Sequence, residues 1–223
     1  MLGPAFAYKC LLSPTVKYHL FKTYTSPIIR SGLASFSLRF ETLKPIIIFH
    51  RKILRGILSL SKNSAIPAIH FLLGKLPIEA QIHRDIFSLF FSVWQNPNSK
   101  IYEIVKYLMQ HSLRNSRTWS RHLMYLAEKY DIEDPLSCLK RDPPNKAEYK
   151  EYIKTKICAY HESNLRTSAI TNSRMTYLNV SLTGLRGRAH PALSGLMTST
   201  DVKNSRIHLK MLTGDCLTQN YIE

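Results

Sequence analysis

Apolar residues recur at intervals of three and four along most of this chain, which is the spacing of helices with one buried face. The first such segment runs from Val16 to Tyr24 and follows Ser13-Pro14. Serine caps free backbone N–H groups and proline suits the first helical turn, so this pair predicts a helix start. Pro27 is expected to interrupt or kink the helix, and Gly32 to end it.

A second, longer helix is predicted from about Glu41 to Leu60. Its broad apolar face consists of Ile46, Ile47, Phe49, Ile53, Leu54, Ile57 and Leu58. Arg51, Lys52 and Arg55 fall on the other side and form a basic stripe. A stripe of this kind either keeps a helix solvated or contacts an anionic partner, and the pattern alone leaves both interpretations open.

Further periodic segments predict helices over 67–73, 77–91, 101–113, 118–130 and 146–169. Asn63-Ser64 is expected to cap the first of these, and Gly74 to stop it. Asp142-Pro143-Pro144-Asn145 is the clearest break, since two prolines stop a helix that enters them. The buried side of the last helix is expected to carry Tyr149, Tyr152, Ile153, Ile157 and Tyr160.

Strands that alternate with helices are not indicated anywhere, so the predicted fold class is all-α. We expect a helical bundle, then further amphipathic helices and a loop-rich C-terminal segment. The predicted divisions are a basic helical segment at 1–60, a helical region at 61–141, a long helix within 142–180, and the segment 181–223.

Composition supports a packed protein. Of the 223 residues, 44% are apolar and 10% aromatic, which excludes the disordered class. Apolar runs such as Ile46–Phe49 are too short to span a membrane, so no membrane partner is expected. The four cysteines do not have metal-clip spacing. They are interpreted as reduced structural thiols of an intracellular protein.

The net charge of +16 is unevenly distributed along the chain. Residues 1–60 contain nine basic residues and one acidic residue. Such an excess predicts a polyanionic partner, because basic side chains that neutralise phosphates release counterions. A mitochondrial presequence is the alternative reading, although the basic residues continue past residue 50. The expected location is therefore nuclear or cytoplasmic rather than mitochondrial.

Catalytic motifs are not found in the sequence. Glycine-rich phosphate loops, metal-binding histidine pairs and nucleophile elbows are absent. Asp131, Glu133 and Asp134 form the one acidic cluster, which we expect to cap the helix at Pro135. Gly184-Leu185-Arg186-Gly187-Arg188 is more suggestive, because glycines let a backbone approach a phosphodiester while arginines contact its oxygens. A tight turn with exposed arginines is the other interpretation.

Several phrases together resemble the thumb and C-terminal region of non-LTR (LINE-type) retrotransposon reverse transcriptases. Leu12-Ser13-Pro14 and residues 20–33, which include Thr23-Tyr24-Thr25-Ser26-Pro27, resemble the first thumb helix. Residues 49–60 resemble the following thumb helix. Further similarity covers 67–83, 115–119, 142–144, 184–191 and 209–215, in the order of the family.

This resemblance implies a chain that lacks the fingers, the palm with its catalytic aspartates, and the zinc-knuckle tail. It therefore implies a non-catalytic fragment without a cofactor or metal, which grips the template–primer backbone. The implied partners are RNA, DNA or an RNA–DNA hybrid, and a palm domain encoded separately. Apolar faces that pack against a palm in the family would favour self-association here.

Two sets of residues are expected to contact phosphates. The first set is Lys17, Lys22, Arg30, Arg51, Lys52 and Arg55, and the second is Arg186 and Arg188. Two other functions stay open at this point. One is a helical scaffold or interaction protein of mitochondria or ribosomes, and the other is a retroelement relic without a selected function.

Overall fold

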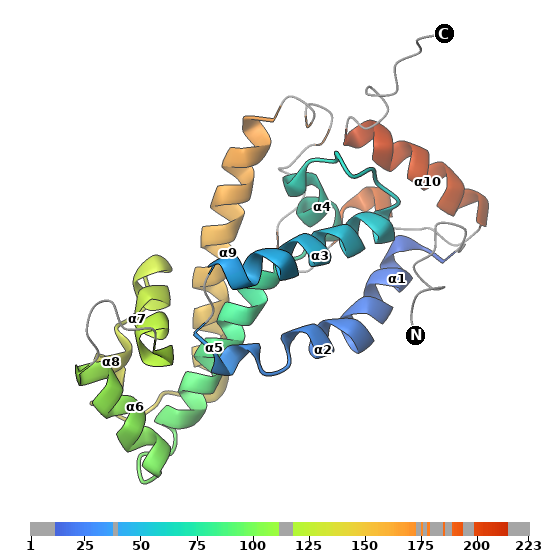
Figure 1. Ribbon diagram of the computed structural model, residues 1–223. Coiled ribbons are helices and arrows are strands. Elements are labelled where there is room, and N and C mark those ends of the chain that lie inside the picture. The colour runs from blue at the N-terminus through green and yellow to red at the C-terminus, as the bar shows by residue number, and fades with distance from the viewer. Residues whose placement is uncertain are drawn as a thin grey trace. The chain divides into compact units, whose positions relative to one another are not determined.

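The computed structural model describes residues 12–37, 40–111, 118–172, 175, 178, 185, 189–193 and 199–213. Regular structure within these residues is helical throughout, so the predicted all-α fold is confirmed (Figure 1). The α-helices are α1 (Pro14–Leu20), α2 (Ser26–Arg30), α3 (Phe40–Leu58), α4 (Ile66–Leu73), α5 (Ile78–Trp94), α6 (Lys100–His111), α7 (Trp119–Lys129), α8 (Pro135–Cys138), α9 (Lys146–Ile170) and α10 (Ser199–Leu212). Among the described helices, none is long and apolar enough to cross a membrane.

The chain divides into two compact units, and each unit is assembled from separate stretches of sequence. Unit 1 comprises Met1–Ile29, Lys44–Pro77 and His161–Glu223, and unit 2 comprises Arg30–Leu43 and Ile78–Tyr160. These units are not the four successive segments that the sequence predicts. Helices far apart along the chain pack into one unit. Changes of composition along the sequence carry no information about such long-range packing.

Side-chain caps begin α1 and α8 where the sequence places them. The Ser13 hydroxyl accepts a hydrogen bond from the Val16 N–H at the start of α1, at 3.4 Å. Asp134 caps α8 in the same way, since its carboxylate accepts from the Ser137 N–H at 3.1 Å. Because local hydrogen bonds decide such positions, short-range sequence signals predict them well.

The first α-helix is interrupted just before Pro27, in line with the prediction, since α1 ends at Leu20 and α2 begins at Ser26. The preceding residues Phe21–Thr25 form a π-helical turn, in which the Ser26 N–H donates to the Phe21 carbonyl. This wider turn lets the chain continue as α2 past a residue that has no N–H of its own. The chain then turns at Gly32, whose φ of +76° lies in the left-handed region.

A second correction concerns the start of α4. Asn63-Ser64 does not cap it, because the N-cap residue is Ala65 and no side chain accepts a hydrogen bond there. Ser64 instead donates its hydroxyl to the Ser61 carbonyl at 2.8 Å. The predicted end of α4 is confirmed, since Gly74 adopts a φ of +61° and its N–H bonds back into the last turn.

Helix α4 is the centre of unit 1. Its residues from Pro67 to Leu73 are all buried. The segment around the 3₁₀ turn Pro191–Leu193 packs against it, because the His190 N–H donates to the Leu72 carbonyl at 2.8 Å. From α9, the guanidinium of Arg166 lies 5.6 Å from the Phe71 ring centroid. These contacts join the later part of the chain to α4 within unit 1.

Aromatic side chains dominate the core of unit 2. The buried residues of α5 include Phe87, Phe90, Phe91 and Trp94. From α9, Tyr149 stacks on Phe91 with the ring centroids 4.7 Å apart. Burial of several rings of this size supplies most of the hydrophobic stabilisation of a small helical unit.

The predicted buried side of α9 is confirmed in part. Tyr149, Ile153 and Ile157 are buried, as their spacing of four residues indicates. Tyr160 is half-buried. Tyr152 is 41% exposed, so its assignment to the core is wrong, and its ring lies at the edge of a cavity instead.

Candidate nucleic-acid interface

The excess positive charge of the chain belongs mainly to unit 1. The stretches that form this unit contain 16 Lys and Arg residues against four Asp and Glu residues. Those of unit 2 contain 15 against 11. The fold therefore joins residues 44–77 and 161–223 to the basic N-terminal stretch in one unit, whose net charge is +12 against +4 for unit 2.

Unit 2 balances many of its cations internally. Its described ion pairs are Arg30–Asp85, Arg141–Glu133, Lys154–Glu151 and Lys156–Asp131. Among the described residues of unit 1, Arg166 pairs with Glu162 at 2.7 Å. The scarcity of acidic residues in unit 1 leaves it with a strongly positive potential, which attracts polyanions.

Helix α3 carries the largest group of predicted contacts. Its buried residues are Leu43, Ile47, His50, Leu54, Ile57 and Leu58. Arg51 and Arg55 border this buried face and are half-buried, whereas Lys52 is exposed. Phe49, which the sequence assigns to the apolar face, is 51% exposed. The basic stripe thus lies beside the buried face, with Lys52 and an aromatic ring on the solvent side.

Two buried histidines lie beside the arginines of α3. The His70 Nδ1 donates to the Lys75 carbonyl at 3.0 Å. Burial lowers the pKa of His70 to about 4, and the charges of Arg51 and Arg55 act in the same direction against the opposing effect of that hydrogen bond. Burial, His70 and Arg51 lower the pKa of His50 to about 3. Both imidazoles are therefore neutral near pH 7, and Arg51 and Arg55 provide the positive charge here.

Lys75 is a basic residue of this surface that the sequence analysis did not select. Burial lowers its pKa, and the nearby charge of Lys22 adds to this effect. The Lys75 ammonium also lies 5.5 Å from the centroid of the Tyr18 ring. The structure thus brings Lys22, from the π-helical turn, close to a residue 53 positions later. The position of Lys75 directly after the helix-ending Gly74 was the available sequence signal.

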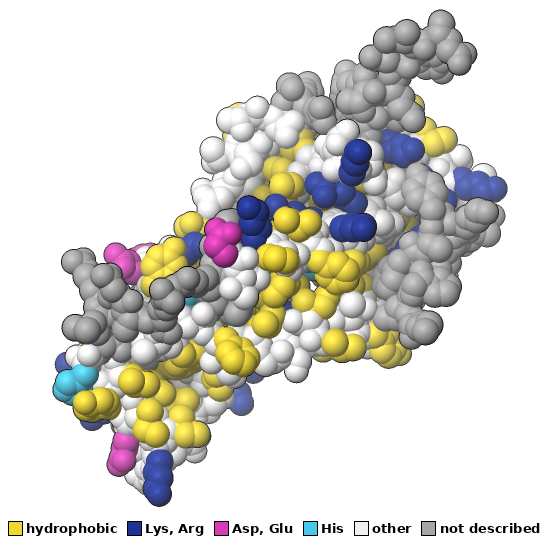
Figure 2. Space-filling model, viewed as in Figure 1, with side chains coloured by type: hydrophobic (Ala, Val, Ile, Leu, Met, Phe, Trp, Pro, Cys, Tyr) yellow, Lys and Arg dark blue, Asp and Glu magenta, His cyan; other side chains and the backbone are white. Residues whose placement is uncertain are grey.

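Helix α10 contributes a second basic face. Lys203, Arg206 and Lys210 follow one another at spacings of three and four residues, so they share a side of the helix. In the view of Figure 2, Lys and Arg side chains gather over α3 and over α10. These residues are not among the predicted contacts, because residues 181–223 taken alone have only a small net charge.

The predicted phosphate contacts have different environments. Lys22 and Lys52 are exposed and Arg51 is half-buried, all three in unit 1. Lys17 is 1% exposed, so its inclusion among the surface contacts is wrong. The apolar periodicity of α1 did not identify it as a buried position, because lysine is seldom buried. Arg186 and Arg188 lie outside the described residues.

Two further predicted contacts have structural partners. Arg30 belongs to unit 2 and donates two hydrogen bonds to the Asp85 carboxylate, at 2.6 and 2.8 Å. Arg55 donates from Nη2 to the Ser64 carbonyl at 3.2 Å, which fixes the loop after α3. These bonds give both guanidinium groups a structural role within their units.

Within the described stretches, no group of three or more His, Cys, Asp and Glu side chains could hold a metal ion. The described cysteines, Cys138 and Cys158, are buried, and neither forms a disulfide. Comparison of the chain with known protein families, curated proteins and solved structures finds no match in any of the three.

Proposed function

We propose that this chain binds the backbone of nucleic acids through the basic surface of unit 1. The observation that carries the proposal is the ratio of 16 basic to four acidic residues in this unit, against 15 to 11 in unit 2. A solvated surface that only maintains solubility does not require this segregation. A polyanion with regularly spaced phosphates is the partner whose charge complements it.

The proposed contacts are made by flexible cations and assisted by aromatic rings. Lys22, Lys44, Lys52 and Lys203 are exposed and belong to unit 1. Lysine is a point charge that approaches phosphate without strict geometry, so binding is expected to tolerate any sequence. Exposed rings near such cations stack on unpaired bases, which also occurs without sequence preference.

Binding without catalysis is part of the proposal. It follows from the resemblance to the thumb region of non-LTR reverse transcriptases, whose metal-binding aspartates lie in the palm. The corresponding substrate is a template–primer, and an RNA–DNA hybrid is its most specific form. We therefore expect an order of affinity with the hybrid first.

The test is the binding of labelled single-stranded RNA, duplex DNA and RNA–DNA hybrid by fluorescence anisotropy, at about 50–300 mM salt. Dissociation constants of about 1–100 µM at physiological salt, with a steep decrease in affinity as salt rises, support the proposal. A preference for the hybrid supports its link to reverse transcription. A folded monomer that binds none of the three contradicts the proposal and favours a scaffold function.

Two matched quadruple variants separate a specific surface from total charge. One replaces Lys22, Lys44, Lys52 and Lys203 by alanine, and the other replaces Lys100, Lys140, Lys146 and Lys150, which are exposed on unit 2. Both lower the net charge equally. Each lost phosphate contact reduces the salt slope by about 0.9 on duplex DNA, so the first variant should reduce the slope by up to about 3.6. Equal losses in the two variants would contradict a localised interface.

A further inference from the structure

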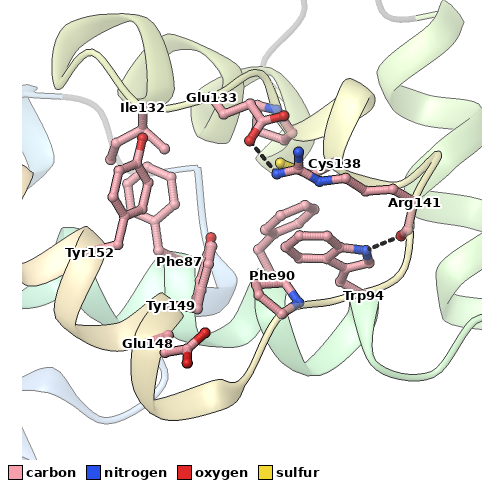
Figure 3. A pocket seen from close by; sticks show the side chains of 12 residues that line it. Phe87, Phe90, Trp94, Ile132, Glu133, Cys138, Arg141, Glu148, Tyr149 and Tyr152 are labelled. Atoms are coloured by element: carbon pink, nitrogen blue, oxygen red, sulfur yellow. Dashed lines mark hydrogen bonds and ion pairs between the residues drawn. The ribbon is translucent and has the colours of Figure 1, made fainter.

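Unit 2 contains a cavity of about 350 Å³ whose walls are largely aromatic. Phe87, Phe90 and Trp94 from α5 form one side, and Tyr149 and Tyr152 from α9 form the other (Figure 3). This volume is within the range of small-molecule sites, and a mostly apolar lining with a few polar groups is typical of them. None of these residues belongs to the basic surface of unit 1.

The aromatic walls are held in place by contacts with one another and with neighbouring residues. The Trp94 Nε1 donates to the Arg141 carbonyl at 2.9 Å. Tyr149 stacks on Phe91 at 4.7 Å and meets the edge of Trp94 at 5.9 Å. These rings keep their orientation without a ligand, so binding does not have to order them.

The charged residues at the cavity are Glu133, Glu148 and Arg141. Two carboxylates and one guanidinium give this lining a net negative charge, in a chain whose net charge is +16. Figure 3 shows the two glutamates on opposite sides of the cavity, with Tyr149 between them. An anionic ligand would be repelled by this arrangement, whereas a cation would be attracted.

A cationic side chain of the protein itself, Arg141, already contacts a carboxylate and an aromatic ring of the cavity. The guanidinium of Arg141 forms an ion pair with Glu133 and lies 5.9 Å from the centroid of the Trp94 ring. The combination of a carboxylate and an aromatic face is the means by which proteins bind organic cations. Glu148 offers a second carboxylate at the other side of the same cavity.

The Cys138 thiol and the Tyr149 hydroxyl at the cavity are neutral near pH 7. Burial raises the pKa of the Cys138 thiol to about 11, and the charge of Glu133 adds to this effect. Burial likewise raises the pKa of the Tyr149 hydroxyl well above its usual value. The thiol is therefore not a thiolate nucleophile, and the cavity is suited to binding rather than to covalent chemistry.

We propose that this cavity binds a small organic cation with an apolar body, such as an aromatic or alkyl ammonium compound. The ammonium group lies against the rings of Tyr149 and Tyr152 and pairs with Glu148. The apolar body fills the space between Phe87 and Phe90. This site is independent of nucleic-acid binding and does not depend on the function proposed above.

The test uses benzyltrimethylammonium as the probe, with benzyl alcohol and phenylacetate as neutral and anionic controls. Binding to the full chain is followed by the indole N–H signal of Trp94 in NMR spectra. The Trp119→Phe variant distinguishes this signal from that of the second tryptophan. We expect saturable binding of the cation, at least about tenfold tighter than that of benzyl alcohol, and none of phenylacetate. Equal binding of the cation and the neutral probe, or no binding of the cation, overturns the proposal.

Three variants test the assigned charges. Glu148→Gln is expected to weaken binding of the cation about fivefold or more, because it removes the carboxylate and keeps the shape. Glu103→Gln, an exposed glutamate of α6 away from the cavity, should leave binding unchanged. Arg141→Gln removes the internal cation, releases Glu133 and should tighten binding. No difference among the three variants, with all three folded by circular dichroism, overturns the role of charge in this site.

Discussion

Arg30 holds Asp85 with two parallel hydrogen bonds, from Nη2 to Oδ1 at 2.6 Å and from Nε to Oδ2 at 2.8 Å. The Arg30 Nη1 also donates to the Gln81 side chain at 3.3 Å. The guanidinium thus bridges two positions of α5 that are one helical turn apart. This forked geometry is the strongest form of an ion pair in proteins.

The Arg30–Asp85 geometry predicts a structural role for Arg30. The two side chains are 30% and 31% exposed, so solvent reduces the Coulombic contribution without removing it. Arg30→Met is expected to lower the free energy of unfolding by about 1–2 kcal/mol, measured by urea denaturation. The same variant should keep the salt slope for nucleic-acid binding. A reduced slope with unchanged stability would restore Arg30 to the phosphate contacts.

The buried histidines predict a loss of stability in mild acid. The pKa values of His50 and His70 are lowered to about 3 and about 4, whereas the unfolded chain has the ordinary value of about 6.5. The unfolded state therefore binds more protons below about pH 6.5, and stability decreases as pH falls from there toward pH 4. The slope is up to about 1.4 kcal/mol per pH unit for each imidazole. Urea denaturation between about pH 7 and 5 measures it.

A substitution at His70 isolates its contribution to the pH dependence. His70→Asn keeps a donor near the position of Nδ1, so the hydrogen bond to the Lys75 carbonyl can persist. It removes the titrating group, and the slope of stability against pH should fall by the share of one imidazole. His111→Gln, at an exposed position, serves as the control. An unchanged slope in His70→Asn would contradict this explanation.

Short-range signals predicted much of the secondary structure, and long-range packing accounts for most of the errors. Ser13, Asp134 and Gly74 act through bonds to residues within one turn, so their roles followed from the sequence. The burial of Lys17 and the ion pair of Arg30 depend on residues far along the chain. The cavity in unit 2 depends likewise on α5 and α9 lying side by side, and neither helix alone indicates it. The resemblance to reverse transcriptases and the predicted self-association stay predictions.

Two glycines should respond to alanine in opposite directions. Gly56 lies within α3, and a Cβ added there meets no atom within 4 Å. Gly56→Ala should stabilise unit 1 by about 0.5–1 kcal/mol, because alanine loses less backbone entropy on folding. Gly32 has a φ of +76°, so Gly32→Ala should destabilise by about 1–2 kcal/mol. Thermal or urea denaturation measures both changes in stability. A Gly32→Ala variant more stable than the original protein would contradict the left-handed turn.

An exposed ring on α3 provides a test that distinguishes stacking from charge. Phe49 is 51% exposed and precedes Lys52 by one helical turn. Exposure of an apolar ring to water does not stabilise the protein. In this position the ring can stack on an unpaired base beside a phosphate that Lys52 contacts. Phe49→Ala should weaken binding of single-stranded RNA by about 1–3 kcal/mol and leave the salt slope unchanged. Binding of duplex DNA, whose bases are already stacked, should change much less. Tyr125→Ala, which removes a ring of similar exposure on unit 2, is the control. Equal effects of Phe49→Ala on single strands and duplex would indicate that the ring supports the fold of α3 and does not contact bases.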